Sequence, residues 1–235
     1  MVVWRYKREI SGGTSVADDK AAMSSYKAQV EQYGTPISED QYKALRNYAE
    51  QNGVKLSGFK DFVGDIKVIQ TVIDDIIEIA EDFPKILNEK LGICLELDYD
   101  MGTDYATTTN GHIIHLNAVF YSDLEMLEED YQEGVRSGRF VRNTDWRAII
   151  RHEVGHVVCS SYNLRPMDIA LELMDERLDA VLIRLMDELS IYSAEYDDGR
   201  EVISECFSGY YSKSGSEFAE QYVKRCLDIV SAKGR

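Results

Sequence analysis

Residues 152–156 of this chain read His-Glu-Val-Gly-His, so two imidazoles stand four residues apart with a carboxylate beside the first. On an α-helix, positions i and i+4 lie on one face, and the ring nitrogens of His152 and His156 can therefore reach one Zn²⁺ ion. Glu153 then faces a water activated by the metal, and its carboxylate can take a proton from that water and pass it to a leaving amine. This spacing is a zinc-hydrolase signature and predicts hydrolysis of a peptide bond without a covalent intermediate.

A catalytic zinc ion normally has three protein ligands and one open position, so a third ligand is expected downstream. One candidate is the acidic group Asp175, Glu176 and Asp179, which belongs to a run with helical apolar spacing from Met167 to Leu189. These acids are more simply explained as the solvated side of that helix. They nevertheless remain an alternative source of the third ligand, with Glu176 foremost.

The other candidate is Glu201, which shares one face of a predicted helix with Glu205, beside apolar neighbours. Two acids next to an apolar face need a reason, and metal binding supplies one. A local explanation competes for the same carboxylate, because Asp198-Gly199-Arg200-Glu201 is also a capping-box variant with Asp198 as the N-cap. Both explanations stay open at this point.

The motif HEVGH, followed 45 positions later by EVISECF, resembles the gluzincin pattern HExxH…ExxxE, in particular the branch that contains anthrax lethal factor. The resemblance implies that Glu201 is the third zinc ligand. It also implies that Glu205 orients a zinc-bound histidine, a role that neighbouring carboxylates commonly have. Ser204 and Cys206 stand where this pattern usually has alanines, which are changes of small residue for small residue.

The stretch Leu-Ser-Ile-Tyr-Ser-Ala at 189–194 resembles the S-x-Y-A segment that precedes ExxxE in metallopeptidase-like proteins of phages and integrated elements. In the lethal-factor branch a tyrosine from this region stabilises the oxyanion, so the resemblance implies this role for Tyr192, with Tyr196 second. A phenol near zinc can donate to developing negative charge. Ordinary packing is the alternative role, since the chain holds 15 tyrosines.

The elements that position these groups have their own signals. Asn143 or Thr144 is the expected N-cap of the motif helix, and apolar residues at 146, 149, 150, 154, 157 and 158 give it an amphipathic pattern. Gly155 weakens such a helix by about 1 kcal/mol relative to alanine. It therefore indicates the close approach of another backbone.

A small sheet is expected before the motif helix. Residues 93–99 alternate apolar and polar side chains, and Asn110-Gly111 marks a turn before a second strand at 112–117. In zincins an edge strand before the HExxH helix binds extended substrate, which is a form of strand addition. By position, and by resemblance to an N-x-I-x-L-N strand in phage-associated relatives, Ile113, Ile114 and His115 are the expected substrate-binding residues. The spacing of His112 and His115 does not suit one face of a strand, so neither is expected to bind the metal.

Further helices are predicted from Ser38 to Gly53, from about Asp65 to Asp82, and after a cap at Ser122-Asp123. Residues 1–35 are weakly patterned and read as an arm. The expected fold is therefore α+β: an N-terminal arm and helical extension at 1–60, then a zincin-like domain at 61–235 with a small twisted sheet and active-site helices.

Composition limits the function. The chain has 235 residues, 44% of them hydrophobic, and a formal net charge of −16, which argues against nucleic-acid binding because that requires neutralising phosphates. Its four cysteines, Cys94, Cys159, Cys206 and Cys226, lack CxxC spacing, and no apolar signal region or 18-residue apolar run is present. We therefore expect a cytoplasmic protein with reduced thiols and no membrane partner. Cys159 and Cys206 are expected to be small core residues.

The function expected from these observations is a zinc-dependent endopeptidase acting on a protein or peptide substrate. Two other classes remain open. One is a non-catalytic phage or mobile-element assembly protein that keeps a structural zinc site, and the other is a regulatory protease or toxin with a single protein target.

Overall fold

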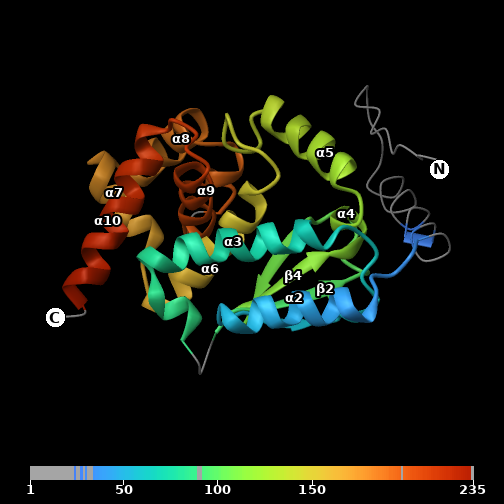
Figure 1. Cartoon of the computed structure of the whole chain (residues 1–235). Helices are drawn as coiled ribbons and strands as arrows, with labels where there is room; N and C mark the ends of the chain where they lie inside the picture. Colours follow the sequence, from blue (N-terminus) through green and yellow to red (C-terminus); the bar gives the residue numbers. More distant parts are fainter. Residues whose placement is uncertain are drawn as a thin grey trace.

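The computed structural model of the chain describes residues 24, 27, 28, 30, 34–88, 92–196 and 198–233. This part has the predicted α+β class, with helices packed around a small sheet (Figure 1). The helices are α2 (Glu39–Gln51), α3 (Ile66–Asp82), α4 (Ala118–Tyr121), α5 (Leu124–Arg136), α6 (Ala148–Tyr162), α7 (Pro166–Met174), α8 (Leu178–Glu188), α9 (Arg200–Tyr211) and α10 (Glu217–Lys233). The strands are β1 (Lys55–Ser57), β2 (Cys94–Asp98), β3 (Ala106–Thr109) and β4 (Ile113–Asn117), and the 3₁₀ turns are η1 (Phe59–Asp61), η2 (Pro84–Leu87) and η3 (Tyr192–Ala194).

The sheet has the strand order β1-β2-β4-β3. β1, β2 and β4 are parallel, whereas β3 is antiparallel to β4, with Thr108 opposite Ile114. The prediction that 112–117 is the edge strand is wrong, because β4 lies between β2 and β3. β3 is the edge strand on the side of α6, and it went unrecognised because only Ala106 of its four residues is buried, so its sequence has no apolar alternation.

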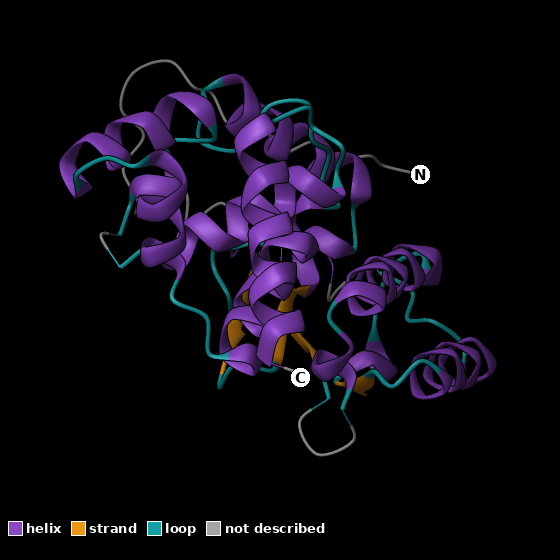
Figure 2. Ribbon diagram, turned by 90° about the vertical axis from the view of Figure 1, so that its left-hand side faces the viewer, coloured by secondary structure: helices purple, strands orange, loops and turns teal. Residues whose placement is uncertain are grey.

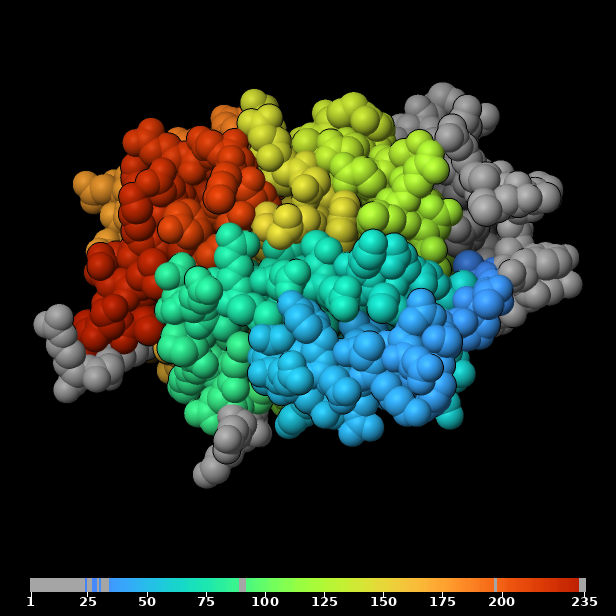
Figure 3. Space-filling model, in the orientation of Figure 1, coloured from blue at the N-terminus to red at the C-terminus, as the bar shows by residue number. Residues whose placement is uncertain are grey.

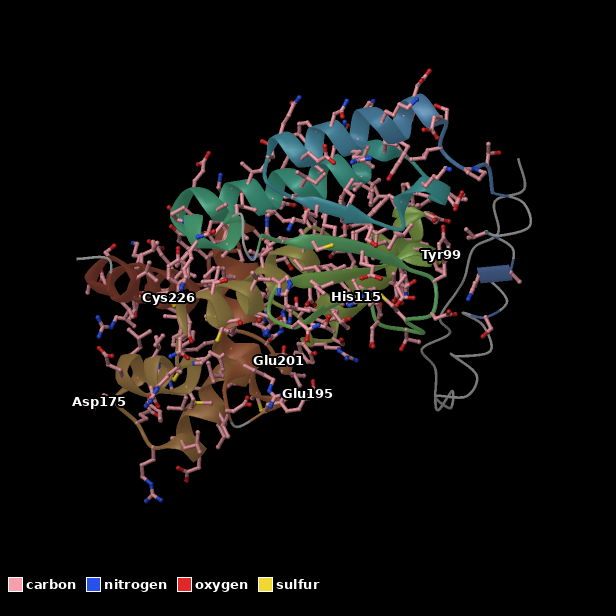
Figure 4. All side chains as sticks on the ribbon, turned by 90° about the horizontal axis from the view of Figure 1, so that it is seen from below. Tyr99, His115, Asp175, Glu195, Glu201 and Cys226 are labelled. Carbon is pink, nitrogen blue, oxygen red and sulfur yellow. The ribbon has the colours of Figure 1, made fainter. Side chains whose placement is uncertain are left out.

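α2 and α3 lie side by side on one face of the sheet (Figures 1 and 4). Both have the start signals read from the sequence. Ser38 and Gln41 form a reciprocal capping box at α2, and the Asp65 carboxylate accepts a hydrogen bond from the backbone N–H of Lys67 at α3. Their predicted positions are confirmed. β1, which precedes residue 61, adds a strand to the same sheet by pairing with β2.

Helix α9 packs against α6, and α7 and α10 pack on α9. These C-terminal residues lie at the opposite end of the molecule from the first described residues (Figure 3), and the strands lie among the helices (Figure 2). The closest helix pair is α6 with α9, and Gly155 makes it possible. A Cβ atom added at this glycine would lie 2.8 Å from the Cα of Ser204. The backbone approach inferred from Gly155 is therefore confirmed, and it joins the motif helix to the helix that contains Glu201.

Two predicted helix boundaries are wrong. α6 begins at Ala148, because the Thr144 hydroxyl donates to the carbonyl of Val141 and Asn143 adopts φ +59°, so neither residue caps it. The predicted helix from Met167 to Leu189 is two helices, since Asp175 ends α7 in the left-handed conformation at φ +51°. None of the described helices is both long and apolar enough to cross a membrane.

Candidate metal centre

The three predicted ligands converge where α6 meets α9. His152 and His156 lie one turn apart on α6, with ring centroids 5.0 Å apart, and Glu201 lies in the first turn of α9. The Oε2 atom of Glu201 is 3.1 Å from Nε2 of His152 and 3.5 Å from Nε2 of His156. Among the described residues, these form the one group of three or more potential metal ligands whose ligand atoms all lie within 4.8 Å of one another.

The separations fit a tetrahedral zinc site. Ligand atoms at about 2.0–2.1 Å from a tetrahedral zinc ion lie roughly 3.3 Å from each other. The two distances measured from Glu201 Oε2, 3.1 and 3.5 Å, lie on either side of this value. A metal ion therefore fits between these atoms with little rearrangement of the backbone.

The hydrogen bonds around His152 direct its second nitrogen toward Glu201. The Nδ1 atom of His152 lies 2.8 Å from Oε1 of Glu205, and the Ser190 hydroxyl donates to Oε2 of Glu205 at 2.7 Å. A neutral His152 that donates from Nδ1 has its lone pair on Nε2, facing Glu201. Glu205 thus has the position expected of a carboxylate that orients a ligand histidine, and Ser190 is an additional residue of this chain of contacts.

The charges around His152, His156 and Glu201 favour the binding of a cation. Oε2 of Glu201 is buried and accepts a hydrogen bond from neither imidazole, although both lie within ion-pair distance. Burial acts to lower the pKa of His152, but the carboxylates of Glu201 and Glu205 outweigh it and raise that pKa to about 10. Burial acts to raise the pKa of Glu201, but His152 and His156 outweigh it and lower that pKa to about 2. The site therefore stabilises positive charge, supplied by a proton or by a divalent metal.

A residue of the sheet forms a hydrogen bond with the side chain of Glu153. The Thr108 hydroxyl lies 2.7 Å from Oε2 of Glu153 and 3.1 Å from its backbone carbonyl oxygen, so the edge strand β3 contacts the residue beside the first ligand. Thr108 was not predicted from the sequence, because the run of three threonines at 107–109 has no feature that distinguishes the middle one.

Tyr192 lies against the ligand group, whereas Tyr196 lies outside it. The ring of Tyr192 stacks on the ring of His152 at 5.6 Å, and the guanidinium of Arg139 is 5.6 Å from its centroid. Burial, with the carboxylate of Glu201, raises the pKa of Tyr192, so the phenol stays protonated and can donate a hydrogen bond. Tyr196 is 41% exposed and contacts Arg200.

A cavity of about 150 Å³ opens beside His152, Glu153 and Tyr192. It extends between β3 and the end of α5 and is walled by aromatic and polar side chains. Apart from His152, Glu153 and Tyr192, the lining residues are Thr103, Asp104, Tyr105, Ala106, Asp130, Tyr131, Gly134, Arg139, Phe140, Ala148, Ile149, Glu205 and Ser208.

The acids that competed for the third-ligand position lie elsewhere. Glu176 accepts a hydrogen bond from Arg184 at 2.6 Å, and the side chain of Asp179 is 80% exposed. The capping alternative for Glu201 is also not realised, because Gly199 occupies the N-cap position and the Asp198 carboxylate accepts from the backbone N–H of Arg200.

The expected substrate-binding residues Ile113, Ile114 and His115 belong to the internal strand β4. Ile114 is buried, and His115 lies 2.8 Å from the hydroxyl of Thr109 rather than at the ligand group. Figure 4 shows His115 on the sheet, apart from Glu201. The Nδ1 atom of His112 lies 2.8 Å from the carbonyl oxygen of Asn110, so neither histidine joins the three ligands.

Comparison with models of protein families, with curated proteins and with solved structures finds no match to this chain. The functional assignment therefore rests on the residues and on their geometry.

Proposed function

We propose that this chain is a zinc-dependent endopeptidase with a zincin-like fold of the gluzincin type. The observation that carries the proposal is the buried Oε2 of Glu201, which faces the Nε2 atoms of His152 and His156 at distances that suit a shared zinc ion. Zinc bound there supplies a Lewis acid that activates water near neutral pH and polarises the carbonyl to be attacked.

The side chains of the protein then move the protons. Glu153 takes a proton from the attacking water as the new C–O bond forms, and it delivers that proton to the amide nitrogen as the C–N bond breaks. The products are a carboxylate and an amine. Tyr192, which keeps its proton, donates a hydrogen bond to the oxygen on which negative charge develops.

The surrounding contacts keep these groups in place. Glu205 and Ser190 hold the ring of His152 from the side opposite the metal, and Thr108 holds the carboxylate of Glu153. We infer that an extended substrate lies along β3, because β3 is the edge strand next to α6 and can pair with an added strand. One substrate side chain then enters the adjacent cavity.

Two features favour catalysis over a purely structural zinc site. Structural zinc sites usually have four protein ligands, whereas the ligand group described here has three. In addition, Glu153 and Tyr192 line the cavity next to that group, and neither is needed to bind the metal.

The proposal is tested by zinc content and peptide cleavage, measured on the same preparations. Wild type and Glu153→Gln should each contain about one zinc per chain by elemental analysis, whereas His156→Ala and Glu201→Gln should lose it. Glu176→Gln is the matched control, because it neutralises an acid that is paired with Arg184 away from the site, and it should keep the zinc.

Wild type should cut members of a random peptide library, read by mass spectrometry, and Glu153→Gln should cut none. Zinc in wild type without any cleavage would contradict a general endopeptidase and would leave a structural zinc site or a protease with a single protein target. Absence of zinc after reconstitution would overturn the proposal.

A further inference from the structure

Exposed apolar side chains concentrate on one segment of the molecule. The described residues have six large hydrophobic side chains that are exposed, and five of these lie between residues 178 and 196. We call them the α8 apolar surface, which consists of Leu178 (41% exposed), Ile183 (65%), Met186 (46%), Ile191 (50%) and Tyr196 (41%). Ile183 and Met186 lie one turn apart on α8, so their exposed side chains are neighbours, and neighbouring exposed apolar side chains are characteristic of an interaction site.

The fold itself does not need these side chains. α8 packs on the rest of the molecule through Val181 and Leu185, which are one turn apart and fully buried. Ile183 and Met186 lie outside this buried side, at positions where an amphipathic surface helix usually has polar residues, whereas Leu178 lies on the buried side at the first residue of α8 but is still 41% exposed. The apolar side of α8 is thus wider than the part of the helix that packs against the rest of the molecule.

The charge around this surface is acidic. Residues 175–196 contain six carboxylates and two guanidinium groups, a net charge of −4. Arg184 pairs with Glu176 and Glu188, and Arg177 lies 3.8 Å from Asp179. Within the described part of the chain, Asp175, Asp187 and Glu195 have no ion-pair partner. The surface therefore complements a segment that has apolar and basic residues.

The segment that follows α8 leads to the candidate metal centre. Ile191 and Tyr196 flank Tyr192, whose ring stacks on His152. The backbone N–H groups of Ile191 and Tyr192 donate to the carbonyls of Gly138 and Arg139, which attaches this stretch to the wall of the cavity. In the view of Figure 4, Asp175 lies farther from Glu201 than Glu195 does. A chain bound on the surface is thereby directed toward the cleft.

We propose that the α8 apolar surface docks a basic, amphipathic segment of the protein that this enzyme cleaves. Cleavage of the docked protein rests on the proposed function, whereas docking itself does not depend on it. Charge disfavours the two other occupants. In a dimer formed through this surface, two segments that each have a net charge of −4 would face and repel each other. An anionic membrane would be repelled by the same carboxylates.

Docking is tested with a fluorescent helical peptide of about 18 residues built from leucine and lysine, added to the zinc-loaded full chain at physiological salt. Two comparison peptides replace lysine by glutamate, or leucine by serine. Saturable 1:1 binding of the leucine/lysine peptide alone is expected, read by fluorescence anisotropy. Equal binding of the lysine/serine peptide would show attraction by charge only and would overturn the proposal.

Paired variants locate the contact. Ile183→Asn with Met186→Asn should weaken binding at least about tenfold, and Asp187→Lys with Glu195→Lys should also weaken it. Leu124→Asn is the matched control, because it removes an exposed leucine from α5, and it should bind as wild type does. Unchanged binding in the Ile183/Met186 variant would refute the site. A wild-type dimer that dissociates in this variant during sedimentation would assign the surface to a second copy instead.

The docking result and the proposed activity can fail separately. Glu201→Gln, which lacks a predicted metal ligand, should bind the peptide as tightly as wild type does. Docking is thereby tested independently of zinc. Joining the leucine/lysine segment to the random library should lower the KM of wild type while leaving kcat unchanged. An unchanged KM would restrict the surface to partners that are not cut. No cleavage of either library, with peptide binding intact, would remove the proposed function and leave the docking site.

Discussion

Replacing Gly155 by alanine should separate the two helices that contain the metal ligands. The new Cβ would lie 2.8 Å from Ser204 Cα, 3.3 Å from Phe207 Cβ and 3.4 Å from the carbonyl oxygen of Ile203. Ordinary contact begins near 3.4 Å, so α9 must move by about 0.6 Å, and the nearest atom is backbone that cannot rotate away.

The expected size of the effect follows from two opposing terms. Overpacking of this kind costs about 1–3 kcal/mol, and the higher helix propensity of alanine returns about 1 kcal/mol. We expect a net loss of up to about 2 kcal/mol in the free energy of unfolding. Because a metal site tolerates displacement of only about 0.5 Å, zinc affinity should also fall at least about tenfold.

Urea unfolding of the metal-free protein and zinc titration against a chelating dye measure the two effects separately. Gly209→Ala is the control, since it makes the same exchange in α9 but meets side-chain atoms of Ser214, Val141 and Ala219 at 3.1–3.3 Å. It should change neither quantity substantially. If Gly155→Ala were as stable as wild type and bound zinc as tightly, the α6–α9 contact would not govern the ligand geometry.

Glu205→Ala should lower zinc affinity about 10- to 100-fold in a chelator competition, because it removes the carboxylate that orients His152, and an affinity equal to wild type would assign Glu205 a role in packing alone. Asp75→Asn should lower the free energy of unfolding in urea by about 3 kcal/mol, since it leaves the buried Arg151 without its main partner. Glu78, whose side chain is half-exposed, is the control, and Glu78→Gln should cost under about 1 kcal/mol. Similar losses in the two variants would contradict this distinction. Thr108→Val should retain zinc but lower kcat on a cleaved peptide by about tenfold, with Thr108→Ser near wild type, and an unaffected kcat in the valine variant would show that β3 does not position Glu153.

Local signals in the sequence predicted the parts of the fold that depend on neighbouring residues. The cap at Ser38, the cap at Asp65 and the glycine at position 155 each have a short-range cause, and the structure agrees with all three. The two histidines were predictable because HExxH has a fixed helical geometry, whereas Glu201 was favoured over Glu176 only through the resemblance to the gluzincin pattern.

Features that arise from tertiary contact were missed. β3 has one buried residue in four, so its pairing depends on β4 and not on its own pattern. The break at Asp175 requires a left-handed conformation that aspartate adopts only occasionally, and no glycine marks it. Asp75 lies within the apolar pattern of α3, and its bonds to Arg147 and Arg151 span more than 70 residues, beyond the reach of any local pattern.

Because α6 and α9 contact each other directly, the sequence and length of the chain between them can vary without separating the two helices. Residues 163–199 leave the metal centre after α6 and return at Glu201, and of this stretch Ser190 and Tyr192 have identified contacts with the ligand group or with the glutamate that supports it. Lengthening a surface excursion costs little conformational entropy, about 0.6 kcal/mol for each doubling. The sequences of α7 and α8, and with them the proposed docking surface, can therefore change while the candidate metal ligands on α6 and α9 keep their positions.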